Sequence, residues 1–184
     1  MIVTRTKIPD VIVLEPRVHK DARGFFLETY NDRSFKANTG LDYTFVQDNQ
    51  SRSRKGTLRG LHYQIEHAQG KLVRVSSGKI FDVAVDLREQ SKTFGQWVGV
   101  ELSDENQHQL WIPPGFAHGF LVLSESADLC YKTTDYWYSE HECVIRYDDV
   151  DLGITWPLLD VDFTISDRDK QGQNFSESLI YKNT

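Results

Sequence analysis

The sequence predicts an all-β fold, a sandwich or barrel with a few short helices. Apolar and β-branched residues come in many short runs, turn residues separate these runs, and few stretches have a helical period. The chain also contains 4 Trp, 8 Tyr and 10 Phe, residue types that suit strands and an aromatic-lined pocket. Many short strands at close spacing are typical of sandwiches and barrels.

Nine segments are expected to be strands, in chain order residues 11–14, 24–30, 43–47, 71–75, 79–87, 96–102, 119–123, 127–133 and 143–147. Glycines at 78, 95, 99, 115 and 119 punctuate them as turns or close backbone approaches. Residues 32–37 and 103–106 are expected to be short helices, the second with Ser103 and Asn106 as a loose capping pair.

Residues 79–87 carry the clearest alternation. The odd positions from 81 to 87 are uniformly apolar and are expected to face a core. The even positions place Asp82 and Asp86 among small apolar residues, which is unusual for a solvent face. The strand therefore indicates a polar cavity on its second side.

Length and charge limit the class of protein. The 184 residues are expected to form one domain, 1–184, large enough to bury roughly 70% of its unfolded surface without a metal or disulfide staple. A net charge of −6 disfavours general nucleic-acid binding. No apolar run reaches membrane-helix length, residues 1–10 lack a signal-peptide core, and Cys130 and Cys143 cannot form a disulfide framework. A cytoplasmic protein is expected.

The most informative segment runs from residue 47 to residue 64. Its hydrogen-bonding side chains, followed by Arg59 and His62, can line one cavity if the segment is extended. Strict alternation would put Arg59 and His62 on opposite faces, so Gly60 would have to introduce a bulge or bend. A hydrogen-bonded core histidine is the alternative interpretation of His62.

A second segment, Leu-Trp-Ile-Pro-Pro-Gly-Phe-Ala-His-Gly-Phe at 110–120, contains Pro-x-Gly-x-x-His. It resembles the second cupin motif, in which a Pro-Gly turn leads into a strand that carries a histidine, here His118. The first cupin motif usually supplies a His-x-His pair and a glutamate for a metal, but this chain has His62, Tyr63 and Gln64. Transition-metal sites usually need three or four ligands, so no metal or other cofactor is expected.

A closer resemblance rests on nine motifs in order. They are D-A-R-G-F-F at 21–26, F-V-Q-D-N at 45–49, L-R-G-L-H at 58–62, Q-G-K-L-V-R at 69–74, F-D-V-A-V-D at 81–86, T-F-G-Q-W at 93–97, L-W-I-P at 110–113, G-F-A-H-G-F at 115–120 and Y-K at 131–132. From about residue 2 to residue 169 the chain resembles the dTDP-4-dehydrorhamnose 3,5-epimerases, metal-free cupin-fold enzymes. The resemblance implies a cupin-type jelly roll that inverts C3 and C5 of dTDP-4-dehydro-6-deoxy-D-glucose.

Each inversion beside the C4 ketone needs a base, an acid on the opposite face and a cation near the carbonyl oxygen. By the resemblance, these are His62, Tyr131 and Lys71, with Asp169 orienting the histidine; Asp167 lies two residues away, so that register is open. A phenol can return a proton if nearby cations lower its pKa. The alternative interpretations are a packing residue for Tyr131, a surface lysine for Lys71 and a solvated charge run for the segment that contains Asp169.

The resemblance also implies a substrate-binding set. The residues that match diphosphate contacts are Arg23 and Arg59, and those that match nucleotide contacts are Glu28, Gln47 and Asn49. Trp137, flanked by Tyr136 and Tyr138, aligns with a tyrosine that stacks on the base. The polar side is assigned Lys71 and Asp82, and alignment alone adds His118, Glu142 and Arg168. A few such cations suffice for two phosphates within a net acidic chain. A buried, paired carboxylate is the alternative for Asp82, and a structural histidine for His118.

Three further expectations remain. The family forms homodimers with exchanged N-terminal strands, and residues 1–10 are compatible with this. The segment after Asp169 has no family motif and is expected to pack loosely. The alternative functions are an epimerase acting at C3 or C5 alone, a metal-dependent cupin enzyme, and a catalytically silent nucleotide-sugar binding protein.

Overall fold

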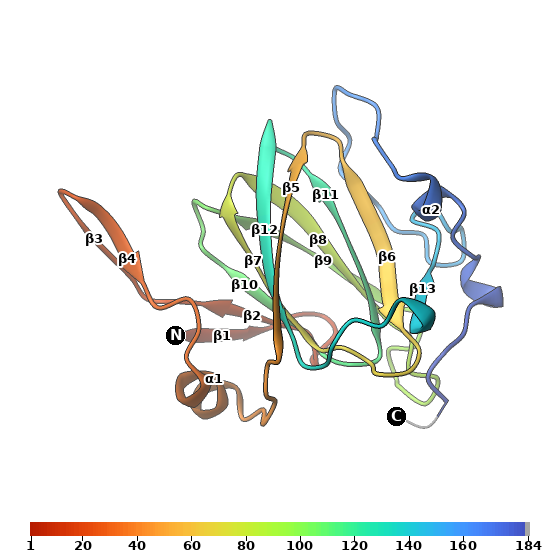
Figure 1. Cartoon of the computed structure of the whole chain (residues 1–184), viewed down its shortest axis with the longest axis horizontal. Helices are drawn as coiled ribbons and strands as arrows, with labels where there is room; N and C mark the ends of the chain where they lie inside the picture. The colour runs from red at the N-terminus through yellow and green to blue at the C-terminus, as the bar shows by residue number, and fades with distance from the viewer. Residues whose placement is uncertain (183–184) are drawn as a thin grey trace.

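The computed structural model describes residues 1–182, which form thirteen strands and two α-helices. Two antiparallel sheets pack face to face, and a hairpin projects from them (Figure 1). The first sheet has the order β1 (Ile2–Arg5), β2 (Ile12–Glu15), β10 (Gln109–Ile112), β7 (Lys71–Ser77), β12 (Ser126–Thr133) and β5 (Gln47–Arg54). The second has the order β13 (Glu142–Val144), β6 (Leu58–Gln64), β11 (Phe116–Val122), β8 (Lys79–Asp86) and β9 (Trp97–Ser103). This arrangement confirms the predicted all-β sandwich.

The remaining elements lie outside the two sheets. They are the hairpin β3 (Val18–Asp21) and β4 (Gly24–Leu27), the helices α1 (Asp32–Thr39) and α2 (Asp167–Lys170), and the 3-10 turns η1 (Ser139–His141) and η2 (Phe175–Glu177). Asn31 caps α1 through a hydrogen bond from the Ser34 N–H, and Gly40 ends it with φ 73°. Within residues 1–182, neither α-helix has the length and apolar character needed to cross a membrane.

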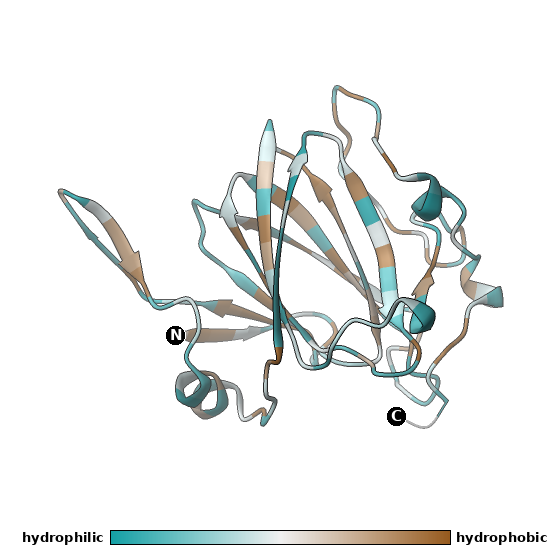
Figure 2. Cartoon of the chain, in the orientation of Figure 1, coloured by the Kyte–Doolittle hydropathy of each residue, from teal (hydrophilic) through white to brown (hydrophobic). Residues whose placement is uncertain are grey.

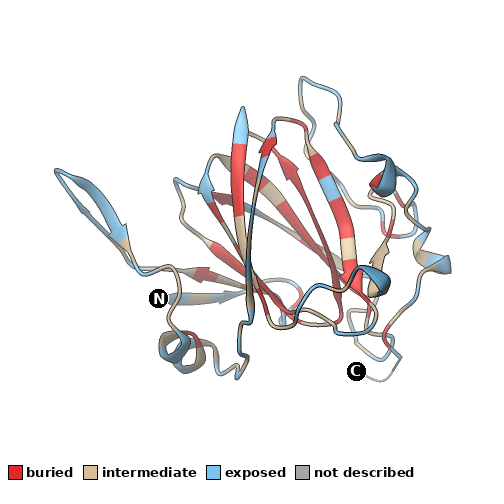
Figure 3. Ribbon diagram, in the orientation of Figure 1, coloured by how far each residue is buried: buried red, intermediate tan, exposed pale blue. Residues whose placement is uncertain are grey.

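Three clusters of apolar side chains hold the layers together. The largest lies between the sheets and joins residues of β7, β10 and β12 to residues of β8, β9 and β11. A second covers the outer side of β6 and β8, and a third packs Phe35 of α1 and Trp111 on the outer side of the first sheet. Apolar and buried residues accordingly follow the strands, whereas the hairpin β3–β4 is exposed (Figures 2 and 3).

Several expected elements are confirmed, namely those that correspond to α1, β2, β7, β8, β9 and β12. The strand expected at 119–123 starts earlier, at Phe116, and the one expected at 143–147 ends at Val144. The strand expected at 24–30 ends at Leu27. Three short strands were not anticipated, β1, β3 and β10. Strands β5 and β6 correspond to the segment 47–64, considered above as extended.

Two predictions of local structure are wrong. Residues 43–46 are not a strand, because the rings of Tyr43 and Phe45 pack on Trp111 instead of belonging to a paired strand. Residues 103–106 are not a helix, although Ser103 and Asn106 do exchange the two predicted capping hydrogen bonds of 3.1 Å. Gln107 follows with φ 56°, a left-handed conformation that ends the turn after one hydrogen bond.

Residues 170–182 do not pack loosely, contrary to the expectation for the segment after Asp169, whose last two residues lie outside the described part of the chain. Tyr181 is 7% exposed, lies in the second apolar cluster and donates its hydroxyl to the Gln64 carbonyl. Its backbone bonds to Leu87 and Glu89, and the Tyr63 hydroxyl donates to the Leu179 carbonyl at 2.7 Å. Single anchors of this kind have no periodicity that the sequence could reveal.

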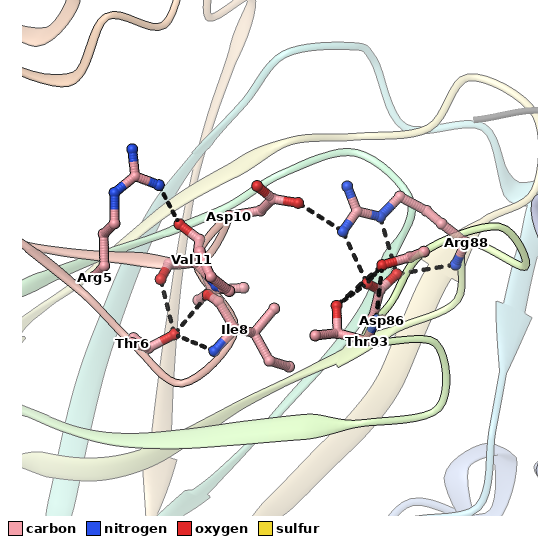
Figure 4. A network of polar contacts seen from close by, with 10 residues as sticks. Arg5, Thr6, Ile8, Asp10, Val11, Asp86, Arg88 and Thr93 are labelled. Atoms are coloured by element: carbon pink, nitrogen blue, oxygen red, sulfur yellow. Dashed lines mark hydrogen bonds and ion pairs between the residues drawn. The ribbon is translucent and has the colours of Figure 1, made fainter.

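A buried ion pair connects two loops at one end of the sandwich (Figure 4). Asp86, at the end of β8, accepts hydrogen bonds from Arg88 Nε at 2.9 Å, from Arg88 Nη2 at 2.8 Å and from the Thr93 hydroxyl at 2.7 Å. Arg88 Nη2 also donates to Asp10, in the β1–β2 connection, at 2.8 Å. Burial alone would raise the pKa of Asp86, but these donors hold it below its usual value. The pair fixes the β8–β9 connection to the N-terminal strands.

Candidate active site

A cavity of about 260 Å³ opens between the two sheets. Its walls come from β5 and β12 of the first sheet, from β6 and β11 of the second, and from the start of β7. The lining residues are Asn49, Gln50, Ser51, Arg59, His62, Lys71, His118, Gly119, Phe120, Leu129 and Tyr131. Six of the residues predicted to form the site therefore meet in one place: Asn49, Arg59, His62, Lys71, His118 and Tyr131.

The predicted break in alternation at Gly60 is confirmed. The β11–β6 register shifts between His118 and Phe120, and Gly60 has φ 125°. A Cβ at Gly60 would lie 2.5 Å from the Cα of Gly119, so only glycine allows this approach. As a result Arg59 and His62 both line the cavity, although they are three residues apart on one strand.

His62 is paired with Asp169 and not with Asp167. The Nε2 atom of His62 lies 2.7 Å from Asp169 Oδ1, and the second carboxylate oxygen accepts the Gly60 N–H at 3.2 Å. Ser166 caps α2 by accepting the Asp169 N–H, which places this side chain behind the imidazole. The Asp167 side chain is 93% exposed and lies 3.9 Å from Lys170.

The ionised state of Asp169 determines which nitrogen of His62 donates to it. Burial would raise the pKa of Asp169, but the hydrogen bonds and charge of its partners, His62 first among them, hold it below its usual value. An ionised carboxylate can only accept, so Nε2, the His62 nitrogen that faces Asp169, is the donor of this hydrogen bond, and Nδ1 is the other ring nitrogen. The imidazole is therefore arranged as a base with a fixed orientation.

Tyr131 and Lys71 project from the opposite sheet. Burial raises the pKa of the Tyr131 phenol, with Glu142 adding to the effect and Arg59 opposing it, so the phenol is a neutral proton donor at pH 7. Arg59 acts to lower this pKa, as expected of a nearby cation, but burial outweighs its effect. Burial lowers the pKa of Lys71 to about 8, against the opposing charges of Glu142 and Asp82. The Lys71 ammonium lies 3.5 Å from the His62 carbonyl.

A second histidine–carboxylate pair lies beneath the cavity. His118 Nε2 is 2.9 and 3.0 Å from the two carboxylate oxygens of Asp82, and both side chains are buried. Burial lowers the pKa of His118, while Asp82 opposes the shift. Asp82 does not line the cavity; it supports His118 from β8, as the buried, paired alternative for Asp82 predicts.

Two polar side chains in the cavity wall have geometry suited to an anionic or carbonyl-rich ligand. Arg59 donates through Nε to Ser53 Oγ at 3.1 Å, and its guanidinium reaches the cavity. Asn49 accepts from Gln47 Nε2 at 2.9 Å, but its own buried Nδ2 has no hydrogen-bond partner within residues 1–182. A buried amide donor without a partner is costly unless a ligand supplies an acceptor.

A further predicted group lies around Glu142. Its Oε2 accepts from the Trp137 indole at 3.1 Å and from Arg168 at 2.7 Å. Trp137 is 53% exposed, and its backbone N–H donates to Gln47 Oε1 at 3.1 Å. The charge of Glu142 acts on both Lys71 and Tyr131, so this group adjoins the cavity.

Comparison with known proteins identifies the family. A protein-family model described as dTDP-4-dehydrorhamnose 3,5-epimerase matches residues 5–177. The chain belongs to this family. The dTDP-4-dehydrorhamnose 3,5-epimerase of Pseudomonas aeruginosa is 59% identical over 95% of this chain and 96% of its own.

Solved structures of the epimerase family are closely similar. The epimerase of Legionella pneumophila in complex with dTDP-4-keto-L-rhamnose has a TM-score of 0.96 at 47% identity, over 99% of this chain and 98% of its own. A 3'-monoepimerase from Streptomyces bikiniensis in complex with dTDP-quinovose has a TM-score of 0.87 at 33% identity, over 94% and 87%. These neighbours confirm the cupin-type jelly roll.

Two predicted residues of this epimerase-family chain lie away from its cavity. Arg23 is at the tip of the β3–β4 hairpin, where it pairs with Asp21 at 2.6 Å, and Glu28 follows the hairpin and accepts from Asn31 at 3.1 Å. Figure 1 shows the hairpin extending away from both sheets. One chain therefore does not bring these two residues to the site.

Several wall residues were not assigned individually to the site, although Gln50 and Ser51 belong to the segment 47–64 that was expected to line a cavity. Gln50, Ser51, Phe120 and Leu129 line the cavity, and Ser53 holds Arg59. Strand alternation from Asn49 or Tyr131 could have identified Ser51, Ser53 and Leu129, each an even number of residues away. Gln50 has the opposite parity, so no simple pattern marks it.

The metal-ligand positions of cupins are not reproduced in this chain. Both donors and the acceptor of the Gln64 amide are hydrogen-bonded to backbone groups. Within residues 1–182, no three His, Cys, Asp or Glu side chains gather so that they could hold a metal ion. The side chains of residues 1–182 do not fit the cupin metal centre.

Proposed function

We propose that the protein is an isomerase that inverts C3 and C5 of dTDP-4-dehydro-6-deoxy-D-glucose, giving dTDP-4-dehydro-L-rhamnose. One observation carries this function. His62, on one sheet and paired with Asp169 of α2, faces Tyr131 and Lys71 of the other sheet across a shared cavity. A base and an acid on opposite walls are what inversion at an enolisable carbon requires.

The geometry suggests how one inversion proceeds. His62 Nδ1 takes the proton from C3, and the C–H electron pair moves into an enolate whose negative charge lies on the C4 oxygen. Asp169 stabilises the imidazolium, and the Lys71 ammonium stabilises the enolate oxygen. Tyr131 then donates its phenolic proton to the other face of C3, and solvent restores both side chains. The same steps at C5 complete the reaction.

Binding is assigned to residues around this cavity. Arg59 is proposed to contact the diphosphate and Asn49 Nδ2 to donate to the nucleotide, which would satisfy the buried amide. The half-exposed Trp137 ring is proposed to stack on thymine. His118, Glu142 and Arg168 complete the set.

Arg23 and Glu28 are proposed to act in the site of a partner chain within a homodimer. Phe25 and Phe26, on the same hairpin, are 59% and 71% exposed, which favours a protein surface that covers them. Mixing equal amounts of inactive R23A and inactive H62N chains should restore up to about a quarter of the wild-type activity. About half of the dimers are then mixed, and one of the two sites in each mixed dimer has both Arg23 and His62. No recovery, or a monomer in light scattering, would exclude the exchange.

Deuterium exchange tests the reaction itself. In D₂O, the enzyme should place deuterium at both C3 and C5 of the keto sugar, and H62N should abolish it. Deuterium at one carbon only would favour the alternative function, a single-position epimerase. Normal exchange by H62N would refute the assignment of the base.

We further propose that residues 1–184 act as one domain and that the protein works in the cytoplasm. The C-terminal segment returns to β6 and β8, which favours a single folding unit. A nucleotide sugar with two phosphates does not cross a membrane unaided, so enzyme and substrate must share a compartment. A single urea transition and cell fractionation are the respective tests.

A further inference from the structure

We propose that Gln64 and Gln69, together with Gln47, are positioning residues that hold the 134–138 loop so that Trp137 is a preformed platform for the nucleotide base. This inference rests on the proposed function, because it takes dTDP as the ligand. It assigns a role to Gln64, which occupies a cupin metal-ligand position without serving a metal.

The 134–138 loop joins β12 to η1 and is held mainly by side chains. Three glutamines bind four successive residues of its backbone. The Asp135 carbonyl accepts from Gln69 Nε2 at 2.9 Å, the Tyr136 carbonyl from Gln64 Nε2 at 3.1 Å, the Trp137 N–H donates to Gln47 Oε1 at 3.1 Å, and the Tyr138 N–H donates to Gln64 Oε1 at 2.6 Å. These bonds replace the ladder that a strand would have supplied.

Gln64 is the centre of this arrangement. It is 3% exposed, lies two residues after His62 on β6, and donates a second hydrogen bond to the His67 carbonyl at 2.8 Å. Its amide therefore uses two donors and one acceptor, all on backbone groups. No other uncharged side chain of this length supplies both functions, which explains a glutamine at this position.

The Trp137 side chain is held from its other end as well. Its indole N–H donates to Glu142 at 3.1 Å, while the ring remains 53% exposed. Backbone and ring are thus both fixed while much of the ring surface is free. A platform ordered in advance costs less entropy on binding, so the glutamines should contribute to affinity more than to the proton transfers.

Replacement of Gln64 by Met tests this division. Q64M removes all three amide bonds at similar side-chain volume. We expect dTDP to bind roughly tenfold more weakly and KM to rise by a similar factor, because two of the lost bonds order the loop. The kcat for deuterium exchange should fall less than twofold, since no amide bond of Gln64 involves His62 or Tyr131.

The experiment is a double-mutant cycle on dTDP affinity, measured by calorimetry with W137A, Q64M and the double variant. If Gln64 acts through Trp137, the double variant should bind no more weakly than W137A. Q69M, which loses only the Asp135 bond, should weaken dTDP binding to a smaller degree. Q96M is the matched control, because Gln96 also donates to a backbone carbonyl, that of Lys92, remote from the loop.

Each outcome is informative. Additive losses in the double variant, or lowered kcat with unchanged dTDP affinity in Q64M and Q69M, would overturn the inference. If Q64M fails to show a cooperative thermal transition, Q69M and the W137A/Q69M pair decide by the same criteria. If the wild-type protein exchanges deuterium but W137A binds dTDP normally, the platform is refuted and the proposed reaction stands. If the wild type neither binds dTDP nor exchanges deuterium, the proposed function itself fails.

Discussion

Substitution of Asp169 by Asn tests the arrangement of the base most directly. The carboxylate accepts two hydrogen bonds, from His62 Nε2 at 2.7 Å and from the Gly60 N–H at 3.2 Å. An amide has one acceptor oxygen, so either the Gly60 N–H or the imidazole N–H would face an NH₂ group. The substitution also removes the charge that stabilises the imidazolium.

The magnitude follows from the charge-assisted hydrogen bond. Such a bond contributes about 1.5–3 kcal/mol, which corresponds to a loss of roughly 10- to 150-fold in kcat. The assay is the initial rate of deuterium incorporation at C3 in D₂O with saturating substrate. Asp167→Asn is the matched control, because that side chain is exposed two residues away and should retain the wild-type rate. The reasoning would be refuted if D169N stayed within twofold of wild type, or if D167N lost as much.

Three further predictions concern Tyr131, Lys71 and the Asp86–Arg88 pair. Y131F should lose product formation, because the donor on the second face is gone, while isotope exchange in recovered substrate persists in part; mass spectrometry of both sugars distinguishes these outcomes. Since the Lys71 pKa is about 8, its ammonium is lost as pH rises through that value, so kcat should decline above pH 8, and K71R should abolish this decline if it remains active. R88M leaves Asp86 buried without its ion-pair partner and should lower the free energy of urea unfolding by about 3–5 kcal/mol at pH 7. The pKa of Asp86 is lower in the folded than in the unfolded state, so its contribution to stability is present above the unfolded pKa and is lost as pH falls. The difference in unfolding free energy between wild type and R88M should therefore shrink below about pH 4. A difference that stayed constant with pH would exclude the ion pair as its cause.

The order of local motifs predicted several of the side chains that the fold brings together at the cavity. Alternation placed Asp82 on an inner polar face, and the glycine between Arg59 and His62 was recognised as the position where alternation must break. Both expectations depend on a few neighbouring residues, which sterics constrain strongly. The pairing of His62 with Asp169 spans 107 residues, so spacing alone could not choose between two nearby aspartates.

The failures have a common physical origin. Tyr43 and Phe45 have the alternation of a strand, but aromatic packing on Trp111 produces it without a paired neighbour. Tyr181 anchors the tail through one ring and one hydroxyl, a signal with no period. Gln64 looked like a missing metal ligand, because only the fold reveals which backbone groups its amide meets. Long-range contacts made by single side chains are absent from local patterns.

The projecting β3–β4 hairpin has a kinetic consequence for the proposed dimer. A two-stranded ribbon is marginally stable in water by itself, and this one exposes two phenylalanines. A second chain that covers the hairpin would therefore stabilise the position of Arg23 at its tip. Specific activity should consequently depend on enzyme concentration by mass action, falling after dilution below the dimer dissociation constant and recovering with second-order kinetics on reconcentration.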